Sequence, residues 1–129
     1  TTKNMSLEMD NSPTINMISE FSPLKVVVGS RSLSDSFIIT PDTLISPWLR
    51  KSKRALSKSD LLSLLTLDVD ILLVGTGLIQ EIPNASLFRE FVDKGLSIEF
   101  MDSAAACRTY NILAGEQRRV GAGITLPIE

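Results

Sequence analysis

The segment from Asp70 to Gly121 limits the fold of this chain more than any other part of the sequence. Its apolar runs and turn-forming residues predict a strand, a glycine turn, a helix, a strand, another helix, a turn and a final strand. Strands and helices that alternate in this order usually build a parallel sheet, with the helices as crossover connections. The sequence therefore predicts an α/β fold.

The elements of this segment follow from their apolar patterns. Asp70–Val74 is almost continuously apolar, which is typical of a strand buried on both faces of a parallel sheet. Leu96–Met101 alternates apolar and polar residues, and Val120–Leu126 predicts the final strand. Two helices are expected between these strands, each bounded by a capping residue and a glycine: Asn84 with Gly95, and Asp102 or Ser103 with Gly115.

The residues before Asp70 favour short strands and one helix. Residues 1–14 lack a periodic apolar pattern and are expected to form a disordered tail. Ser59 is the expected N-cap of a short leucine-rich helix that ends near Asp68. Residues 15–129 are therefore expected to form a single α/β domain. Three short strands are predicted at its start, close enough together for an antiparallel meander: 15–21, 24–28 and 36–40.

The composition excludes several classes of site. The chain of 129 residues contains no histidine and one cysteine, so it cannot form a Ser-His-Asp triad, a Cys-His pair or a Cys/His zinc site. We expect no metal and no cofactor, and we lean toward a protein that is not an enzyme. The net charge of −2 gives no field that would attract nucleic acid, and none is expected as a partner.

The hydropathy of the chain predicts no transmembrane segment. No apolar run approaches the roughly 18 residues that a membrane-spanning helix needs. The first residues also lack the apolar core of a signal peptide, and a single cysteine needs no oxidising compartment. A cytoplasmic location is therefore expected.

The turn Gly75–Gly77 is the first candidate site. It follows a predicted buried strand, where open α/β sheets bind ligands, and Asp102 ends the next strand as a possible ribose partner. A dinucleotide fingerprint would require a glycine where this chain has Gln80. The helix start at Asn84 also lies too late in the sequence to place its N-terminus on a phosphate. We favour a tight turn and keep small-molecule binding as an alternative.

The helix that begins near Asp102 carries the second candidate site. Its residues at i, i+3, i+4 and i+7 share one face, expected to point outward: Ala104, Cys107, Arg108 and Asn111. The first turn of a helix and the neighbouring Arg108 both favour a thiolate at Cys107, which would suit a thiol-dependent enzyme. The favoured alternative is a small buried Cys107, with Arg108 and Asn111 tying down loops. Three residues after the helix are candidates for a polar network with Asp102 and Arg108: Glu116, Arg118 and Arg119.

A basic run at Arg50–Arg54, followed by Lys58, is the third candidate. It could contact phosphate or anionic lipid. We favour a solvated loop or a charged edge strand instead, because no aromatic residues interleave with the basic ones and the chain as a whole is acidic.

Several segments together resemble one known protein family: Leu72–Gly77, Gly95 with Ile98–Asp102, Ala105–Leu113, and Glu116 with Arg118–Val120. This is the family of small uncharacterised prokaryotic α/β proteins that includes mitochondrial NADH:ubiquinone oxidoreductase (complex I) assembly factor 3. The resemblance extends from roughly Ile15 to Pro127. The chain departs from the usual pattern at Ser22–Leu24, where a glycine-rich turn is common. The resemblance implies a three-layer α/β domain, with a mixed central sheet and a small extra sheet that corresponds to the N-terminal meander.

The resemblance also implies a function. We expect a non-enzymatic assembly or adaptor protein that binds a protein partner, such as a subunit or the assembly machinery of a membrane respiratory complex. Peripheral contact with the inner membrane and a homo-oligomer are compatible with this role. The alternatives remain a small-molecule-binding protein or a thiol-dependent enzyme. The candidate ligand- or partner-binding residues are Gly75, Thr76, Gly77, Asp102, Cys107, Arg108, Asn111, Glu116 and Arg118.

Overall fold

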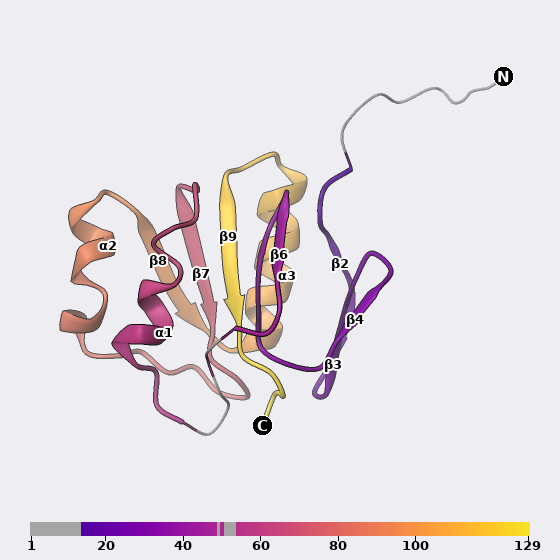
Figure 1. The fold of residues 1–129 in the computed structure, drawn as a ribbon, viewed down its shortest axis with the longest axis horizontal. Helices are drawn as coiled ribbons and strands as arrows, with labels where there is room; N and C mark the ends of the chain where they lie inside the picture. The colour runs from indigo at the N-terminus through magenta and orange to yellow at the C-terminus, as the bar shows by residue number, and fades with distance from the viewer. Residues whose placement is uncertain (1–13, 49, 51–53) are drawn as a thin grey trace, which may run out of the picture.

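A mixed sheet of five strands lies at the centre of the computed structural model, and a separate antiparallel sheet of three strands packs beside it (Figure 1). The structure describes residues 14–48, 50 and 54–129. In the main sheet, β7 pairs in parallel with β8 and β9, whereas β5 pairs antiparallel with β6 and β9. Its strands, in spatial order, are β6 (Thr43–Ile45), β5 (Phe37–Thr40), β9 (Val120–Ile124), β7 (Ile71–Gly75) and β8 (Ser97–Met101).

Two apolar clusters cover the two faces of the main sheet. One face packs against α3 and the small sheet, and the other packs against the shorter helices (Figure 1). The helices are α1 (Lys58–Leu62), η1 (Ala85–Leu87), α2 (Arg89–Asp93) and α3 (Ser103–Gly115). The strands of the small sheet are β2 (Ile18–Ser22), β3 (Lys25–Val28) and β4 (Arg31–Leu33). The three-layer α/β fold, with its mixed central sheet and N-terminal meander, is confirmed.

Strand β7 shows why its sequence is almost entirely apolar. Leu73 belongs to the cluster beneath α3, whereas Leu72 and Val74 belong to the cluster on the opposite face. Successive side chains of a strand point to opposite faces, so a strand covered on both sides needs apolar residues throughout. In β9, a Cβ atom at Gly123 would lie 2.7 Å from Cη2 of Trp48. The glycine is required there because the indole ring packs directly on the strand.

The predicted meander was wrong in its third strand. The predicted strand 36–40 does not continue the small sheet; its residues Phe37–Thr40 form β5 of the main sheet, where Ile39 pairs with Ala122. The third strand of the small sheet is β4, which the sequence analysis did not predict. The reason lies in burial: all four residues of β5 are buried, which suits a strand with a layer on each face.

Two helix starts also differ from the predictions. The N-cap of α1 is Ser57 and not Ser59, because Asp60 completes a capping box with Ser57. Asn84 caps the short η1, and α2 follows as a separate helix. In contrast, α3 begins after Asp102 and ends at Gly115, as predicted. The expected tail falls on residues 1–13, which lie outside the described residues, and on Thr14, which is exposed.

Candidate functional site

The turn Gly75–Gly77 is filled by the first residue of α3. The Ser103 hydroxyl accepts a hydrogen bond from the Gly77 amide at 2.8 Å and donates one to the Thr125 carbonyl at 2.8 Å. Ser103 is fully buried. A Cβ atom at Gly75 would lie 2.9 Å from the Cα of Ser103, so the helix approaches the strand as closely as the backbone allows. The space that a phosphate would take over this turn is therefore occupied by the chain itself.

The loop after this turn is tightly bonded. The Thr76 hydroxyl donates to the Ile79 carbonyl at 2.7 Å and accepts from the Glu81 amide at 3.0 Å. The Gln80 side chain donates to the carbonyl of Phe100 at 2.9 Å, which fastens the loop to β8. These bonds hold the loop in one conformation without burying its apolar side chains.

Three large aliphatic side chains of this loop face solvent. Leu78, Ile79 and Ile82 are 63%, 72% and 66% exposed. We refer to these three residues as the aliphatic loop. Single exposed aliphatic residues are common, but a cluster on an ordered loop is typical of a contact surface. This surface was not among the predicted sites; the signal for it in the sequence is three aliphatic residues in a segment without helix or strand periodicity.

Arg50 holds the aliphatic loop from inside the protein. Its side chain is 2% exposed and pairs with Glu81 at 3.2 Å. It also donates to the Thr125 hydroxyl at 3.1 Å and to the carbonyl of Arg54. The interpretation of the basic run as a solvated loop is thus wrong for Arg50, because its guanidinium is buried. A buried guanidinium is stable only when acceptors such as these satisfy its charge and its N–H groups. Lys51 and Lys53 lie outside the described residues.

Helix α3 turns Cys107 toward the core, which confirms the favoured interpretation of a small buried cysteine and corrects the outward face predicted for this residue. Cys107 is 1% exposed and packs in the same cluster as Ala106 and Tyr110. Arg108 is exposed. Asn111 bridges α3 to the small sheet: its side-chain oxygen accepts from the Ile18 amide at 2.9 Å, and its nitrogen donates to the Ile18 carbonyl at 2.7 Å. The amide side chain therefore takes the place of a strand partner for β2.

The burial of Cys107 gives a first prediction. Desolvation raises the pKa of its thiol from 9.0 to about 12, against the smaller opposite effect of Arg108. Thiolate is therefore scarce at neutral pH, and we expect the folded protein to react with iodoacetamide about a hundredfold more slowly than the protein in concentrated urea. Because the folded pKa is the higher one, this thiol stabilises the fold fully below pH 9.0, and the contribution is lost as the pH rises toward about 12. Rapid alkylation of the folded protein would contradict this placement.

The predicted polar network around both ends of α3 is wrong. Asp102 is the N-cap of α3, and Glu116 is its C-cap. A helix of 13 residues separates them, which amounts to about 20 Å at the usual rise per residue. Arg118 and Arg119 follow Glu116, and Arg119 bonds Asp68 at 2.9 Å and Asp70 at 3.2 Å. Asp102 and Glu116 thus lie at opposite ends of α3.

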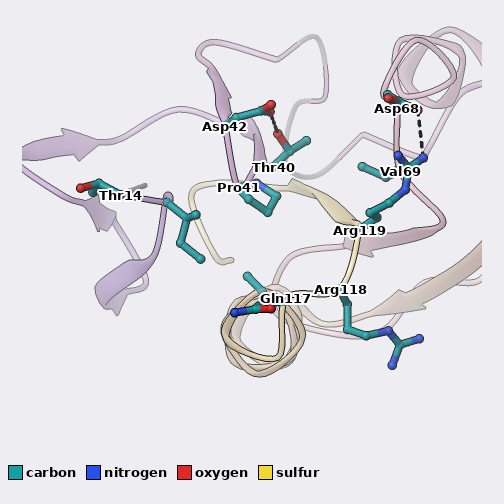
Figure 2. A pocket seen from close by; sticks show the side chains of 11 residues that line it. Thr14, Thr40, Pro41, Asp42, Asp68, Val69, Gln117, Arg118 and Arg119 are labelled. Carbon is teal, nitrogen blue, oxygen red and sulfur yellow. Dashed lines mark hydrogen bonds and ion pairs between the residues drawn. The ribbon is translucent and has the colours of Figure 1, made fainter. Parts of the chain in front are cut away.

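A pocket of about 420 Å³ lies at the end of the sheet near Glu116 (Figure 2). The turn between β5 and β6, the residues before β7 and the C-terminal end of α3 form its walls. Arg118 and Arg119, both predicted for the polar network, contribute to its lining. No group of three or more potential metal ligands occurs among residues 14–48, 50 and 54–129.

The three-layer arrangement and the comparisons with known proteins agree on a family. The family described as "Protein of unknown function (DUF498/DUF598)" matches residues 18–125, and this chain belongs to it. A Bordetella parapertussis protein of known structure superposes with a TM-score of 0.81 at 27% identity, over 88% of this chain and 98% of that chain.

The relatives with descriptive names include a bacterial protein and a vertebrate one. The "13 kDa major membrane protein" of Francisella tularensis is 37% identical over 67 residues, 52% of this chain and 54% of that protein. The "NADH dehydrogenase [ubiquinone] 1 alpha subcomplex assembly factor 3" of Xenopus tropicalis is 30% identical over 73% of this chain and 58% of that protein. The chain thus spans little more than half the length of these relatives. Within the part of the chain that the structure describes, no helix is long and apolar enough to cross a membrane.

Proposed function

We propose that this protein is a non-enzymatic assembly or adaptor protein, whose partner is a subunit or assembly protein of a membrane respiratory complex. The names of the relatives support this role, since matches in Danio rerio, Xenopus tropicalis and Bos taurus are all called assembly factor 3 of the NADH dehydrogenase [ubiquinone] 1 alpha subcomplex. The name of the Francisella tularensis relative supports a place at a membrane. We place the chain in the cytoplasm, in peripheral contact with the inner membrane.

The aliphatic loop is the surface that we assign to the partner. It combines high exposure with a fixed backbone, so docking on it would cost little ordering entropy while removing three aliphatic side chains from water. The turn Gly75–Gly77 leads directly into this loop and is bonded to Ser103 at the start of α3, which Asp102 caps. In this proposal these candidate residues do not contact the partner themselves; they fix the conformation of the aliphatic loop that does.

The alternatives have less support. A small-molecule site over Gly75–Gly77 would compete with the Ser103 side chain for the same space. A thiol-dependent reaction would need Cys107 to be accessible and ionised, whereas it is buried and its pKa is raised.

Serine substitutions test the proposal. A tagged protein should co-purify with subunits of the respiratory NADH dehydrogenase, or with its assembly proteins, from the native organism. Replacing Leu78, Ile79 and Ile82 together by serine should weaken this association about a hundredfold, since truncating buried contacts costs about 1 kcal/mol or more each. The matched control is Val92→Ser with Ile112→Ser, two aliphatic residues that are 57% and 61% exposed on helices away from the loop. The control should bind like the unmodified protein.

Both variants should keep the melting temperature of the unmodified protein, because exposed substitutions change stability little. Unchanged association of the triple variant would contradict the assignment of the loop. Absence of respiratory-complex proteins from the unmodified sample would contradict the proposed function itself.

A further inference from the structure

The pocket near the C-terminal end of α3 has the size of a ligand site. Its volume of about 420 Å³ falls in the usual range of small-molecule pockets. It lies at the opposite end of α3 from the aliphatic loop, so it plays no part in the docking surface proposed above. Four apolar residues form much of its lining: Ile15, Pro41, Val69 and Ala114.

One carboxylate on the rim is held in a fixed position. The hydroxyls of Thr40 and Thr43 both donate to Oδ1 of Asp42, at 2.9 and 3.0 Å. These bonds orient the carboxylate, and the Asp42 side chain is exposed at the rim. The same two bonds lower the pKa of Asp42, so the group stays ionised at neutral pH. The rim therefore presents a charged acceptor that is already oriented.

The two arginines near the pocket do not neutralise the negative charge of the Asp42 carboxylate. The Arg119 guanidinium is bonded to Asp68 and Asp70. The Arg118 side chain runs away from Asp42 and Asp68 in Figure 2. Asp42 and Asp68 lie on one side of the pocket and Gln117 on the other (Figure 2). An ionised carboxylate above an apolar floor is complementary to a cation that carries a hydrocarbon stem.

The end of α3 adds a polar group at the mouth of the pocket. The backbone N–H of Gln117 donates to the Ala114 carbonyl, and the backbone N–H of Arg118 donates to the Leu113 carbonyl, both at 3.0 Å. This pair of bonds is the Schellman motif. Gln117 occupies its left-handed position with φ 64°, where glycine would cost less. The amide side chain of Gln117, which lines the pocket, offers a further hydrogen bond to a ligand.

We propose that this pocket binds a cationic group on a short apolar stem, an alkylammonium or alkylguanidinium. The cation bonds Asp42, and the stem lies on the apolar floor. Such a group can come from a free amine metabolite or from a lysine or arginine side chain of a bound protein.

An NMR titration of the ¹⁵N-labelled protein tests the proposal. The probe is n-butylguanidinium, and the matched neutral probe is n-butylurea. We expect chemical-shift changes centred on Gln117, Arg119 and Ala114 with the cation and none with the urea. Asp42→Asn should weaken binding of the cation about tenfold, as expected when a charged hydrogen-bond acceptor becomes neutral. Asp93→Asn, an exposed carboxylate on α2, should leave it unchanged.

A capped Gly-Arg-Gly peptide distinguishes the two sources. Binding of the peptide at least as tight as that of n-butylguanidinium indicates a protein side chain, whereas binding of the free guanidinium alone indicates a metabolite. Equal binding of n-butylurea, unchanged affinity of Asp42→Asn, or shifts that map elsewhere would each overturn the proposal. None of these results depends on whether the aliphatic loop binds a partner.

Discussion

Arg50→Ala is expected to lower the free energy of unfolding by about 3 kcal/mol, which is a large effect for one residue outside the apolar core. The substitution removes a guanidinium that is 2% exposed and leaves Glu81, the Thr125 hydroxyl and the Arg54 carbonyl without their shared donor. The Glu81 side chain is 35% exposed, so water can take over part of its solvation. For this reason we expect the low end of the range for a broken buried ion pair.

Urea unfolding followed by circular dichroism measures this effect. The matched control is Arg108→Ala, because Arg108 is an exposed arginine that forms no hydrogen bond or ion pair within the described residues. The control should change the free energy of unfolding by less than about 0.5 kcal/mol. Equal effects of the two substitutions would show that Arg50 is not the buried anchor of the aliphatic loop.

Gly75→Ala is expected to lower the free energy of unfolding by about 2 kcal/mol. The added methyl group would lie 2.9 Å from the Cα of Ser103 and 3.1 Å from the Cβ of Ala106. The first of these atoms belongs to the backbone of α3, so the helix itself must move away from β7. That movement also lengthens the bond between the Ser103 hydroxyl and the Gly77 amide. The variant should therefore shift the NMR signals of the aliphatic loop as well.

Gly115→Ala is the control for this second prediction. A Cβ atom at Gly115 would meet only the Cε of Met17, at 4.0 Å, which is an ordinary contact. Alanine is favoured over glycine in a helix, so the change should be neutral or stabilising by up to about 1 kcal/mol. A tolerated Gly75→Ala, with the stability of the unmodified protein, would contradict the close approach of α3 and β7.

The elements that the sequence predicts well are those with local signals. β7 and α3 were placed correctly because an apolar run, a capping Asp102 and a terminal Gly115 mark them within a few residues. β5 was assigned to the wrong sheet because its membership depends on pairing with β9, far along the chain. Single-sequence patterns do not encode such long-range partners.

Long-range contacts also explain why the surroundings of Arg50 and the pocket could not be predicted from the sequence. Arg50 was interpreted as solvated because its neighbours in the sequence are basic, whereas its partner Glu81 lies 31 residues away. Cys107 and Arg108 are adjacent in sequence, but a helix turns one toward the sheet and the other toward solvent. The pocket near Gln117 brings together the residues before β2, the turn after β5, the residues before β7 and the end of α3, and no local motif in the sequence indicates it.

Site-specific photocrosslinking from the aliphatic loop tests the central claim most directly. A photoreactive phenylalanine analogue replaces Ile79, which is 72% exposed, or Ile112 as the control, which is 61% exposed. Irradiation in the native organism should join position 79, and not position 112, to one protein that mass spectrometry identifies as a respiratory NADH dehydrogenase subunit or assembly protein. Adducts of equal yield at both positions, or no adduct at position 79, would contradict docking through the aliphatic loop.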